Sequence, residues 1–282
     1  MLIKTYRDQF KAKLIDLYDE TEVDNFFYML LETYNNLKKY QLALEPGLVL
    51  TPNDLALWDE AVMLLQNYKP IQYIIGKTYF YDGVFNVTPA TLIPRPETEE
   101  LVDLIIKQAN NLSNIKVLDI GTGTGCIAIS LAAFLNNANV TAFDVSEDAL
   151  KVAQSNAVLN EVKVNFVLQD ILQVNKLSNN FDIIVSNPPY VRNLEKVEIK
   201  PNVLNHEPHL ALFVEDNDPL IFYKKITELA TQSLNENGVL YFEINQYLGP
   251  ETVEMIENFK AFKSVELIKD MYGNDRMIAA KK

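Results

Sequence analysis

Residues 187–190, Asn187-Pro188-Pro189-Tyr190, follow a short run that favours a β-strand, so an apolar strand ends here at a rigid polar corner. Pro188 restricts Asn187 to an extended conformation, and neither proline has an N–H. The corner therefore offers hydrogen-bond acceptors, namely the Asn187 side-chain oxygen and backbone carbonyls, with the Tyr190 ring beside them. An –NH2 group suits such acceptors, because both of its hydrogens can be bound while its nitrogen stays exposed. The alternative is an Asn-Pro turn that only closes a strand.

A glycine-rich loop lies upstream and opens a predicted helix, where backbone N–H groups and the helix dipole favour an anion. The dinucleotide fingerprint G-x-G-x-x-G requires glycine at position 126, where this chain has Cys126, so an NAD dehydrogenase is disfavoured. The spacing G-x-G-x-G is more typical of a loop packed against a carboxylate or a nucleoside, and a tight strand-to-helix connection is the alternative. The loop consists of Gly121, Thr122, Gly123, Thr124 and Gly125.

Two acidic residues end the next two predicted strands. Asp144 follows Gly125 by 19 residues (144 − 125), which suits hydrogen bonds to ribose hydroxyls. Asp170 is placed to accept a hydrogen bond from an amino group such as adenine N6, and Ile171 offers apolar contact to the ring. Each aspartate could instead cap a strand or a helix. Because ligands bind beyond the carboxyl ends of parallel strands, these residues together predict a nucleoside cofactor beside the Asn-Pro-Pro-Tyr corner.

The elements that carry these residues alternate between strand and helix after position 114. This alternation predicts an α/β, Rossmann-like fold, with a mostly parallel sheet covered by helices on both faces and an antiparallel hairpin at the C-terminus. The seven predicted strands are residues 115–120, 140–143, 164–168, 181–185, 238–244, 265–269 and 276–280. The predicted helices between them are residues 126–135, 148–159 and 219–234.

The first part of the chain has a different pattern. Residues 4–68 are predicted to be helical, because apolar residues recur at three- and four-residue spacing, for example within residues 22–40. Thr51 suits an N-cap, with proline at the first helical position. A small helical bundle is expected, with its aromatic residues in the core. A β-hairpin follows, with Asp82-Gly83 as a type I′ turn.

Arg95 stands between two prolines in a stiff loop, and the acidic residues after it suit the first turn of a helix. It could form a wall of the active site or be a solvated loop charge. The two histidines, His206 and His209, lack a third ligand at matching spacing, so a structural role is favoured and no metal is expected.

The composition limits the class of protein. A length of 282 residues suits two domains, and no apolar run is long enough to span a membrane. The single cysteine and the lack of an export signal fit a reducing cytoplasm. The net charge is −13; residues 1–80 contain 8 basic and 11 acidic residues, which leaves 17 and 27 for the remainder (25 − 8 and 38 − 11). Neither part is basic, so direct binding of nucleic acid is not expected.

Taken together, these motifs resemble the release factor glutamine methyltransferases, class I S-adenosylmethionine enzymes that methylate the side-chain amide of a glutamine in peptide chain release factors. The Asn-Pro-Pro-Tyr element alone is shared with methyltransferases that act on adenine N6, but the proline-flanked Arg95 loop and the helical front part are more specific. The resemblance extends over nearly the whole chain and covers residues 72–76, 93–99, 117–128, 144–150, 187–190, 207–212 and 273–276.

The resemblance implies three domains: a helical substrate-docking domain in residues 1–70, a hairpin linker in 71–92 and a methyltransferase domain in 93–282. It implies that the glycine loop, Asp144, Ile171 and Asn187 contact the cofactor, and Asp170 joins them on the chemical grounds above. The substrate amide is expected at Asn187, Pro188, Pro189, Tyr190 and Arg95, with Asn187, Pro188 and Tyr190 as the catalytic group. Residues 213–218 and 245–247 lack glycines usual in the family, which leaves their loop geometry open.

The expected mechanism follows from the corner: the Asn187 side-chain oxygen and a corner carbonyl, that of Pro188, accept the two amide hydrogens and leave the nitrogen lone pair free. Two other functions remain open from the residues. One is an N6-adenine methyltransferase acting on RNA or DNA, which the acidic charge disfavours. The other is a non-catalytic nucleoside-binding scaffold, in which residues 213–219 would cover the corner.

Overall fold

The computed structural model describes all residues, 1–282, and the chain forms two compact units. The first unit comprises Met1–Gly76 with Lys200–His206, and the second comprises Lys77–Ile199 with Glu207–Lys282. Each unit has its own hydrophobic core.

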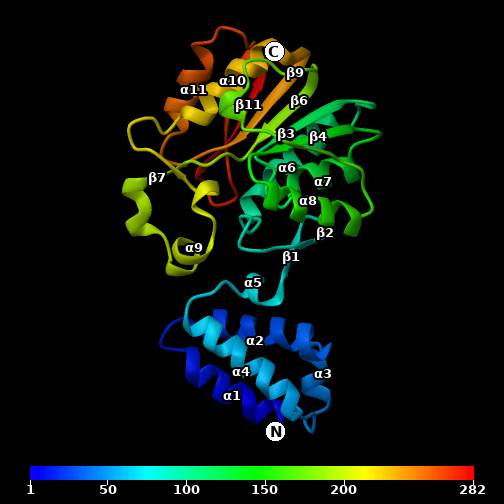
Figure 1. The fold of residues 1–282 in the computed structure, drawn as a ribbon, viewed down its shortest axis with the longest axis vertical. Helices are drawn as coiled ribbons and strands as arrows, with labels where there is room; N and C mark the ends of the chain where they lie inside the picture. Colours follow the sequence, from blue (N-terminus) through cyan, green and yellow to red (C-terminus); the bar gives the residue numbers. More distant parts are fainter. The chain divides into compact units, whose positions relative to one another are not determined.

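The first unit is helical, as predicted (Figure 1). Thr51 caps its fourth helix by accepting a hydrogen bond from the Asp54 N–H, with Pro52 at the first helical position. The second helix ends earlier than residue 40, because Asn36 adopts a left-handed conformation (φ 53°) that caps the helix. The helices are α1 (Ile3–Leu14), α2 (Glu20–Asn35), α3 (Lys39–Leu44), α4 (Pro52–Gln66), α5 (Ile71–Ile75) and α9 (Pro201–His206).

Aromatic side chains fill the core of the first unit, which confirms the prediction made from the apolar stripes. Trp58 is fully buried, and its ring meets those of Tyr6, Phe10 and Phe27 at centroid distances of 5.5, 5.9 and 5.0 Å. Its indole N–H donates to the Asn35 side-chain oxygen at 3.0 Å, so its only polar atom has a partner inside the unit.

The hairpin, β1 (Lys77–Phe80) and β2 (Gly83–Asn86), belongs to the second unit. The prediction that Asp82-Gly83 forms its turn is wrong by one residue, because Phe80 pairs with Gly83 and leaves Tyr81 and Asp82 as the loop. Of these two, only Tyr81 has a positive φ (52°), and its ring packs edge-on against Phe134. The left-handed residue of the turn is therefore Tyr81, whose ring has a tertiary contact, and not Gly83.

The second unit is built on a seven-stranded sheet, which confirms the predicted α/β class. The five strands β9, β6, β3, β4 and β5 are parallel, and the two C-terminal strands pair antiparallel to each other and to β9. In spatial order the strands are β10 (Ser264–Lys269), β11 (Asp275–Lys281), β9 (Leu234–Glu243), β6 (Phe181–Ser186), β3 (Lys116–Ile120), β4 (Asn139–Asp144) and β5 (Asn165–Leu168).

Helices cover both faces of this sheet (Figure 1). On β3, Val117 and Leu118 contribute to the cores on opposite faces, as the two-residue period of a strand requires. The core on one face includes α6 (Pro96–Ala109), α7 (Cys126–Phe134) and α8 (Glu147–Leu159), and the core on the other includes α10 (Ile221–Ser233) and α11 (Gly249–Glu257).

Short elements form the loops at the carboxyl ends of the strands. Two-residue strands β7 (Val191–Arg192) and β8 (Phe213–Val214) pair with each other in parallel. Three turns of 3-10 helix complete this side, namely η1 (Ile171–Gln173), η2 (Asn193–Glu198) and η3 (His209–Ala211). Of these elements, η1 and η3 contribute residues to the cavity described below.

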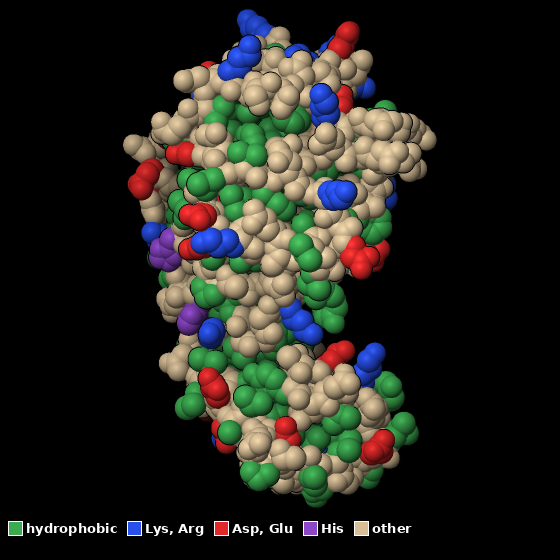
Figure 2. Space-filling model, turned by 45° about the vertical axis from the view of Figure 1, so that its right-hand side comes forward, with side chains coloured by type: hydrophobic (Ala, Val, Ile, Leu, Met, Phe, Trp, Pro, Cys, Tyr) green, Lys and Arg blue, Asp and Glu red, His purple; other side chains and the backbone are tan.

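On the face in Figure 2, Lys and Arg side chains gather towards the upper end and are elsewhere dispersed among acidic ones. No helix has the length and apolar character that crossing a membrane requires.

Candidate active site

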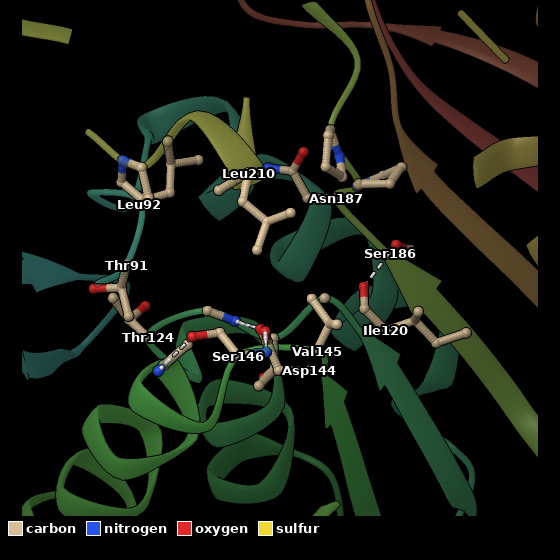
Figure 3. Close-up of a pocket in the computed structure, with 18 of the residues that line it drawn as sticks. Thr91, Leu92, Ile120, Thr124, Asp144, Val145, Ser146, Ser186, Asn187 and Leu210 are labelled. Atoms are coloured by element: carbon tan, nitrogen blue, oxygen red, sulfur yellow. Dashed lines mark hydrogen bonds between the residues drawn. The ribbon is translucent and has the colours of Figure 1, made fainter. Parts of the chain in front are cut away.

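A cavity of about 310 Å³ lies at the carboxyl ends of the central parallel strands (Figure 3). The register of the sheet explains its position: Ile120 pairs with both Phe143 and Ser186, so β3, β4 and β6 end side by side. Asp144 pairs with Leu168 and adds the end of β5 to the row. The loops that follow these four strands all contribute to the cavity wall, as predicted for an open parallel sheet.

Four of the five predicted residues of the glycine loop line one wall, and Gly125 is the one that does not. Gly121, Gly123 and Gly125 have φ of 77°, 54° and 83°, values that other residues rarely adopt. A Cβ at Gly125 would also stand 2.9 Å from the Ile129 side chain, whereas a Cβ at Gly123 would meet nothing within 4 Å. The first two glycines thus keep the backbone next to open space, and the third allows α7 to pack.

Asp144 closes the same wall from the end of β4 (Figure 3). Its carboxylate accepts hydrogen bonds from the backbone N–H of Gly123 at 2.8 Å and of Ser146 at 2.9 Å. Burial raises the pKa of Asp144, while these two donors oppose the shift. The carboxylate therefore fixes the loop and still has lone pairs for a ligand hydroxyl.

Asp119, on β3, lies directly behind this loop. It is fully buried, and its Oδ2 accepts a hydrogen bond from the Thr122 hydroxyl at 2.6 Å, whereas its Oδ1 has no partner. Burial raises the pKa of Asp119 to about 7, and the neighbouring charge of Asp144 adds to the shift.

Asp170 and Ile171 both line the cavity, beyond the end of β5. The Asp170 Oδ1 accepts a hydrogen bond from the Leu172 N–H at 2.9 Å, so the residue also caps η1, the alternative considered from the sequence. Ile171 is buried and offers the apolar contact that was expected of it.

The corner after β6 forms the opposite wall, with Asn187, Pro188 and Pro189 lining the cavity (Figure 3). The Asn187 Nδ2 donates to the Thr98 hydroxyl oxygen at 3.3 Å, which leaves the side-chain oxygen Oδ1 as the free acceptor of this amide. The preceding Ser186 is fully buried and donates to the Ile120 carbonyl at 2.6 Å, which ties the corner to the neighbouring strand.

Tyr190 is the one residue of the corner that does not line the cavity. It packs against the core that includes α10, and its hydroxyl donates to the Glu243 Oε1 at 3.2 Å. Burial raises the pKa of Tyr190, and the charge of Glu243 raises it further, so the hydroxyl keeps its proton. The geometry gives this tyrosine contacts that hold the corner and none that reach into the cavity.

Arg95 lines the cavity, but part of its guanidinium is already paired with the buried carboxylate of Glu207, at 2.5 Å from Nη2 to Oε1. The other oxygen of Glu207 accepts the Ile93 N–H at 3.1 Å. Glu207 thus holds residues 93–95 against the loop that contains Leu210, whose side chain reaches towards the cavity in Figure 3. Arg95 is therefore not a solvated loop charge, which was the alternative considered from the sequence.

Sequence reasoning missed Thr98, Glu207, Glu243 and Asn245. Thr98 lies within a quoted stretch, but its hydroxyl is 2.6 Å from the Oε2 of Glu243, a residue 145 positions away. A charged residue that closes the apolar strand end at 240–242 was the available signal for Glu243. The Asn245 Nδ2 donates to the Tyr190 carbonyl at 3.0 Å and to Glu195.

The histidines do not form part of this site. His206 lies in the first unit, where its Nε2 shares a hydrogen bond with the Asn67 carbonyl at 2.8 Å, and the His209 ring packs edge-on against Phe213. The structure contains no group of three or more His, Cys, Asp or Glu side chains placed to hold a metal ion.

Comparison with known proteins agrees with this geometry. A family model described as the methyltransferase small domain matches residues 98–210. A release factor glutamine methyltransferase from Flavobacterium psychrophilum is 59% identical over 281 residues, which cover 99% of this chain and 98% of that protein. Another from Bacteroides thetaiotaomicron is 48% identical over 223 residues, which cover 79% of each. The chain belongs to the release factor glutamine methyltransferase family.

Solved structures support the fold of this family member. A methyltransferase from Pyrococcus furiosus is 20% identical, with a TM-score of 0.52, and the match covers 82% of this chain and 99% of that one. At this identity the likeness shows the fold alone. The predicted resemblance to the release factor glutamine methyltransferases is confirmed by the two relatives.

Proposed function

We propose that this protein transfers a methyl group from S-adenosylmethionine to the side-chain amide nitrogen of a glutamine in a peptide chain release factor. The observation that carries the proposal is the corner at Asn187, which brings acceptors to a cavity whose other wall suits a nucleoside. Membership of the family supplies the class of substrate. Because the reaction belongs to translation termination, we propose that the protein acts in the cytoplasm.

The residues at the cavity fit this cofactor. The backbone at Gly121 and Gly123 leaves open the space that side chains would fill, Asp144 offers acceptors, and the buried Ile171 offers an apolar surface. When bound, S-adenosylmethionine supplies a methyl group that is already electrophilic because it is attached to a sulfonium. The work left to the chain is to bind, orient and exclude water.

The amide substrate determines what the corner must do. An amide nitrogen is a weak nucleophile, since its lone pair is delocalised into the carbonyl. The Asn187 Oδ1 and the Pro188 carbonyl accept the two amide hydrogens and direct the lone pair away from the corner. As the nitrogen becomes positive, both acceptors bind it more tightly, which stabilises the transition state more than the bound substrate.

We assign the helical first unit to docking of the release factor. Helices α1 to α5 enclose a core of their own, so the unit is a separate body that can present a surface to a protein. The acidic charge of both parts of the chain supports a protein substrate over a nucleic acid.

The test is mass spectrometry of a purified release factor after incubation with this protein and S-adenosylmethionine. The proposal expects one added methyl group on the side chain of a glutamine, and none when the cofactor is omitted. An RNA sample and a DNA sample are incubated in parallel with labelled cofactor. Label in nucleic acid and an unmodified release factor would establish the adenine methyltransferase instead.

A further inference from the structure

We propose that Glu243 and Thr98 are positioning residues that fix the orientation of the Asn187 amide, so that its oxygen faces the cavity. The inference rests on the proposed function, because it concerns how the same corner receives an amide. Neither residue was assigned a role from the sequence.

Glu243 ends β9 and does not line the cavity. Its side chain is 1% exposed, and each carboxylate oxygen accepts one hydroxyl: Oε2 accepts that of Thr98 at 2.6 Å, and Oε1 accepts that of Tyr190 at 3.2 Å. These two hydroxyls flank the corner, one beside Asn187 and the other at the corner's last residue. A single buried carboxylate thus anchors the corner on both sides.

The positions of the protons decide how the Asn187 amide must lie. An ionised carboxylate has no hydrogen to give, so the Thr98 hydroxyl must donate its only hydrogen to Glu243. The Thr98 oxygen then has only lone pairs left and can accept from Asn187 but not donate to it. Asn187 must present its Nδ2 to Thr98, at 3.3 Å, and its Oδ1 remains for the substrate.

The reverse orientation would place the Asn187 –NH2 towards the cavity, where it would meet the –NH2 of a glutamine side chain. Two donors facing each other cannot form a hydrogen bond. Without Glu243 the Thr98 hydroxyl could donate to the Asn187 oxygen, and both orientations of the amide would be satisfied. The hydrogen bonds from Glu243 through Thr98 to Asn187 therefore select amide substrates, although Glu243 itself does not line the cavity.

Both oxygens of Glu243 accept hydroxyl hydrogens, which is the arrangement of an ionised carboxylate. Burial, the largest effect, raises the pKa of Glu243, and Glu97 on α6 adds to the rise, whereas the Thr98 hydroxyl, Arg276 on β11 and the Tyr190 hydroxyl oppose it. Tyr223 on α10 donates to the Glu243 carbonyl at 3.1 Å, and the Cys126 thiol on α7 lies close enough to be influenced by its charge. Protonation of Glu243 would free the Thr98 hydrogen, so turnover should fall as the pH falls through this raised pKa.

The experiment compares Thr98→Val, Thr98→Ser and Glu243→Gln with the wild-type protein, using a release factor as methyl acceptor. Because a misplaced contact at a reacting centre can cost about a hundredfold, we expect kcat to fall by about tenfold or more in Thr98→Val and Glu243→Gln. The Kd of S-adenosylmethionine, measured by calorimetry, should change by less than about threefold, since neither group belongs to the cofactor wall. Thr98→Ser restores the hydroxyl and should recover most of the lost kcat.

Two further measurements separate positioning from loss of structure. Thr252→Val is the matched control, because it also removes a fully buried threonine hydroxyl, bonded to the Leu248 carbonyl at 2.6 Å, away from the cavity. It should match Thr98→Val in unfolding midpoint but keep the wild-type kcat. The acid limb of the kcat profile should be present in wild type and absent from Glu243→Gln.

The outcomes distinguish this inference from the proposed function. If wild type methylates no release factor, the proposed function fails. If wild type is active and a folded Thr98→Val or Glu243→Gln keeps the wild-type kcat, the positioning role is overturned. Should Thr98→Val not fold, Glu243→Gln and its pH profile decide, because glutamine preserves the size of the side chain; an unchanged acid limb then contradicts the inference.

Discussion

The side chain of Asn187 has one acceptor to offer, and the hydrogen-bond chain behind it determines where that acceptor points. Its Nδ2 is engaged by Thr98, while Pro188 and Pro189 beside it contribute no N–H that could compete for the carbonyls of the corner. A planar –NH2 group placed here meets acceptors that are already oriented. Preorganised polar groups of this kind stabilise developing charge without the cost of reorganisation.

We expect Asn187→Ala to lower kcat for release factor methylation by about a hundredfold or more, taking the loss of one preorganised polar contact as the guide. The Kd of S-adenosylmethionine should change less, because the glycine loop and Asp144 remain. Steady-state kinetics and calorimetry check the two values. Asn179→Ala, in an exposed loop where the side chain reaches only Ser178, is the control that should behave as wild type. An unchanged kcat in Asn187→Ala would contradict the account.

The buried Asp119 should make stability depend on pH. Its pKa is about 7 in the folded chain and about 4 when unfolded, so between these values the folded state holds a proton that the unfolded state has lost. Stability is therefore lost as the pH rises from about 4 to 7. Asp119→Asn removes this titration, because the amide oxygen can still accept from Thr122.

Urea unfolding without cofactor, at pH 5 and pH 8, measures the effect. The stability of Asp119→Asn relative to wild type should rise by roughly 2 to 3 kcal/mol from pH 5 to pH 8, because only the wild type loses stability as the pH rises towards the folded-state pKa of Asp119. The same difference at both pH values would show that Asp119 titrates normally in the folded chain.

At the scale of elements, the order of the strands assembles the site. Strand periodicity and turn residues are local signals, so the sequence predicted the seven strands and placed the glycine loop, Asp144, Asp170 and Asn187 at their ends. The structure brings these residues to one cavity. Their roles in binding remain predictions.

The same local signals could not predict which polar groups would meet across the fold. Thr98 on α6 and Glu243 on β9 meet only in the folded chain, and the local sequence around either residue does not predict the other as its partner. The hairpin turn was missed for a similar reason, since Tyr81 adopts a positive φ while it packs on Phe134. The contact between Tyr81 and Phe134 joins residues far apart in the sequence, so a local turn preference does not include it.

In the turn between β3 and α7, glycine is required for two different reasons, a positive φ and the lack of space for a Cβ. Gly125→Ala combines an unfavourable φ with a Cβ placed 2.9 Å from Ile129 and 3.1 Å from Ala153, whereas Gly123→Ala has only the unfavourable φ. We expect Gly123→Ala to cost about 1 kcal/mol of unfolding free energy and Gly125→Ala to cost about 1 to 3 kcal/mol more, from overpacking.

Urea unfolding of both variants, without cofactor, compares the two costs. The control is internal, since both changes add the same methyl group to the same loop. Equal destabilisation would mean that α7 shifts freely and that close packing at Gly125 does not constrain the loop.

At the scale of the whole molecule, two compact units divide the work that we propose. The second unit contains the entire cavity, and the first contains none of its lining residues. A docking role for the first unit should therefore affect recognition of a whole protein but not the transfer itself. The net charge of −13 leaves a nucleic acid with little electrostatic attraction to either unit.

Trp58→Ala tests the docking role. Truncation of a fully buried tryptophan costs about 3 to 5 kcal/mol, enough to loosen the helical core. The KM for a whole release factor should rise by about tenfold or more, while kcat/KM for a short glutamine peptide stays at its wild-type value, since 1.4 kcal/mol of lost binding is tenfold.

Leu57→Ala is the matched control, because the neighbouring residue of the same helix is 48% exposed and its loss leaves the core intact. Circular dichroism confirms which variant loosens the helices. A Trp58→Ala protein with a melted first unit and an unchanged KM for the release factor would remove the docking role.

The central claim is that the Asn187 oxygen receives the substrate amide, and a crystal structure with S-adenosylhomocysteine and a glutamine-containing release factor peptide tests it most directly. The account predicts the glutamine side-chain nitrogen about 2.6 to 3.2 Å from the Asn187 Oδ1, with the Asn187 Nδ2 still bonded to Thr98. A glutamine amide bound elsewhere in the cavity, or an Asn187 side chain that presents its –NH2 to the substrate, would contradict it.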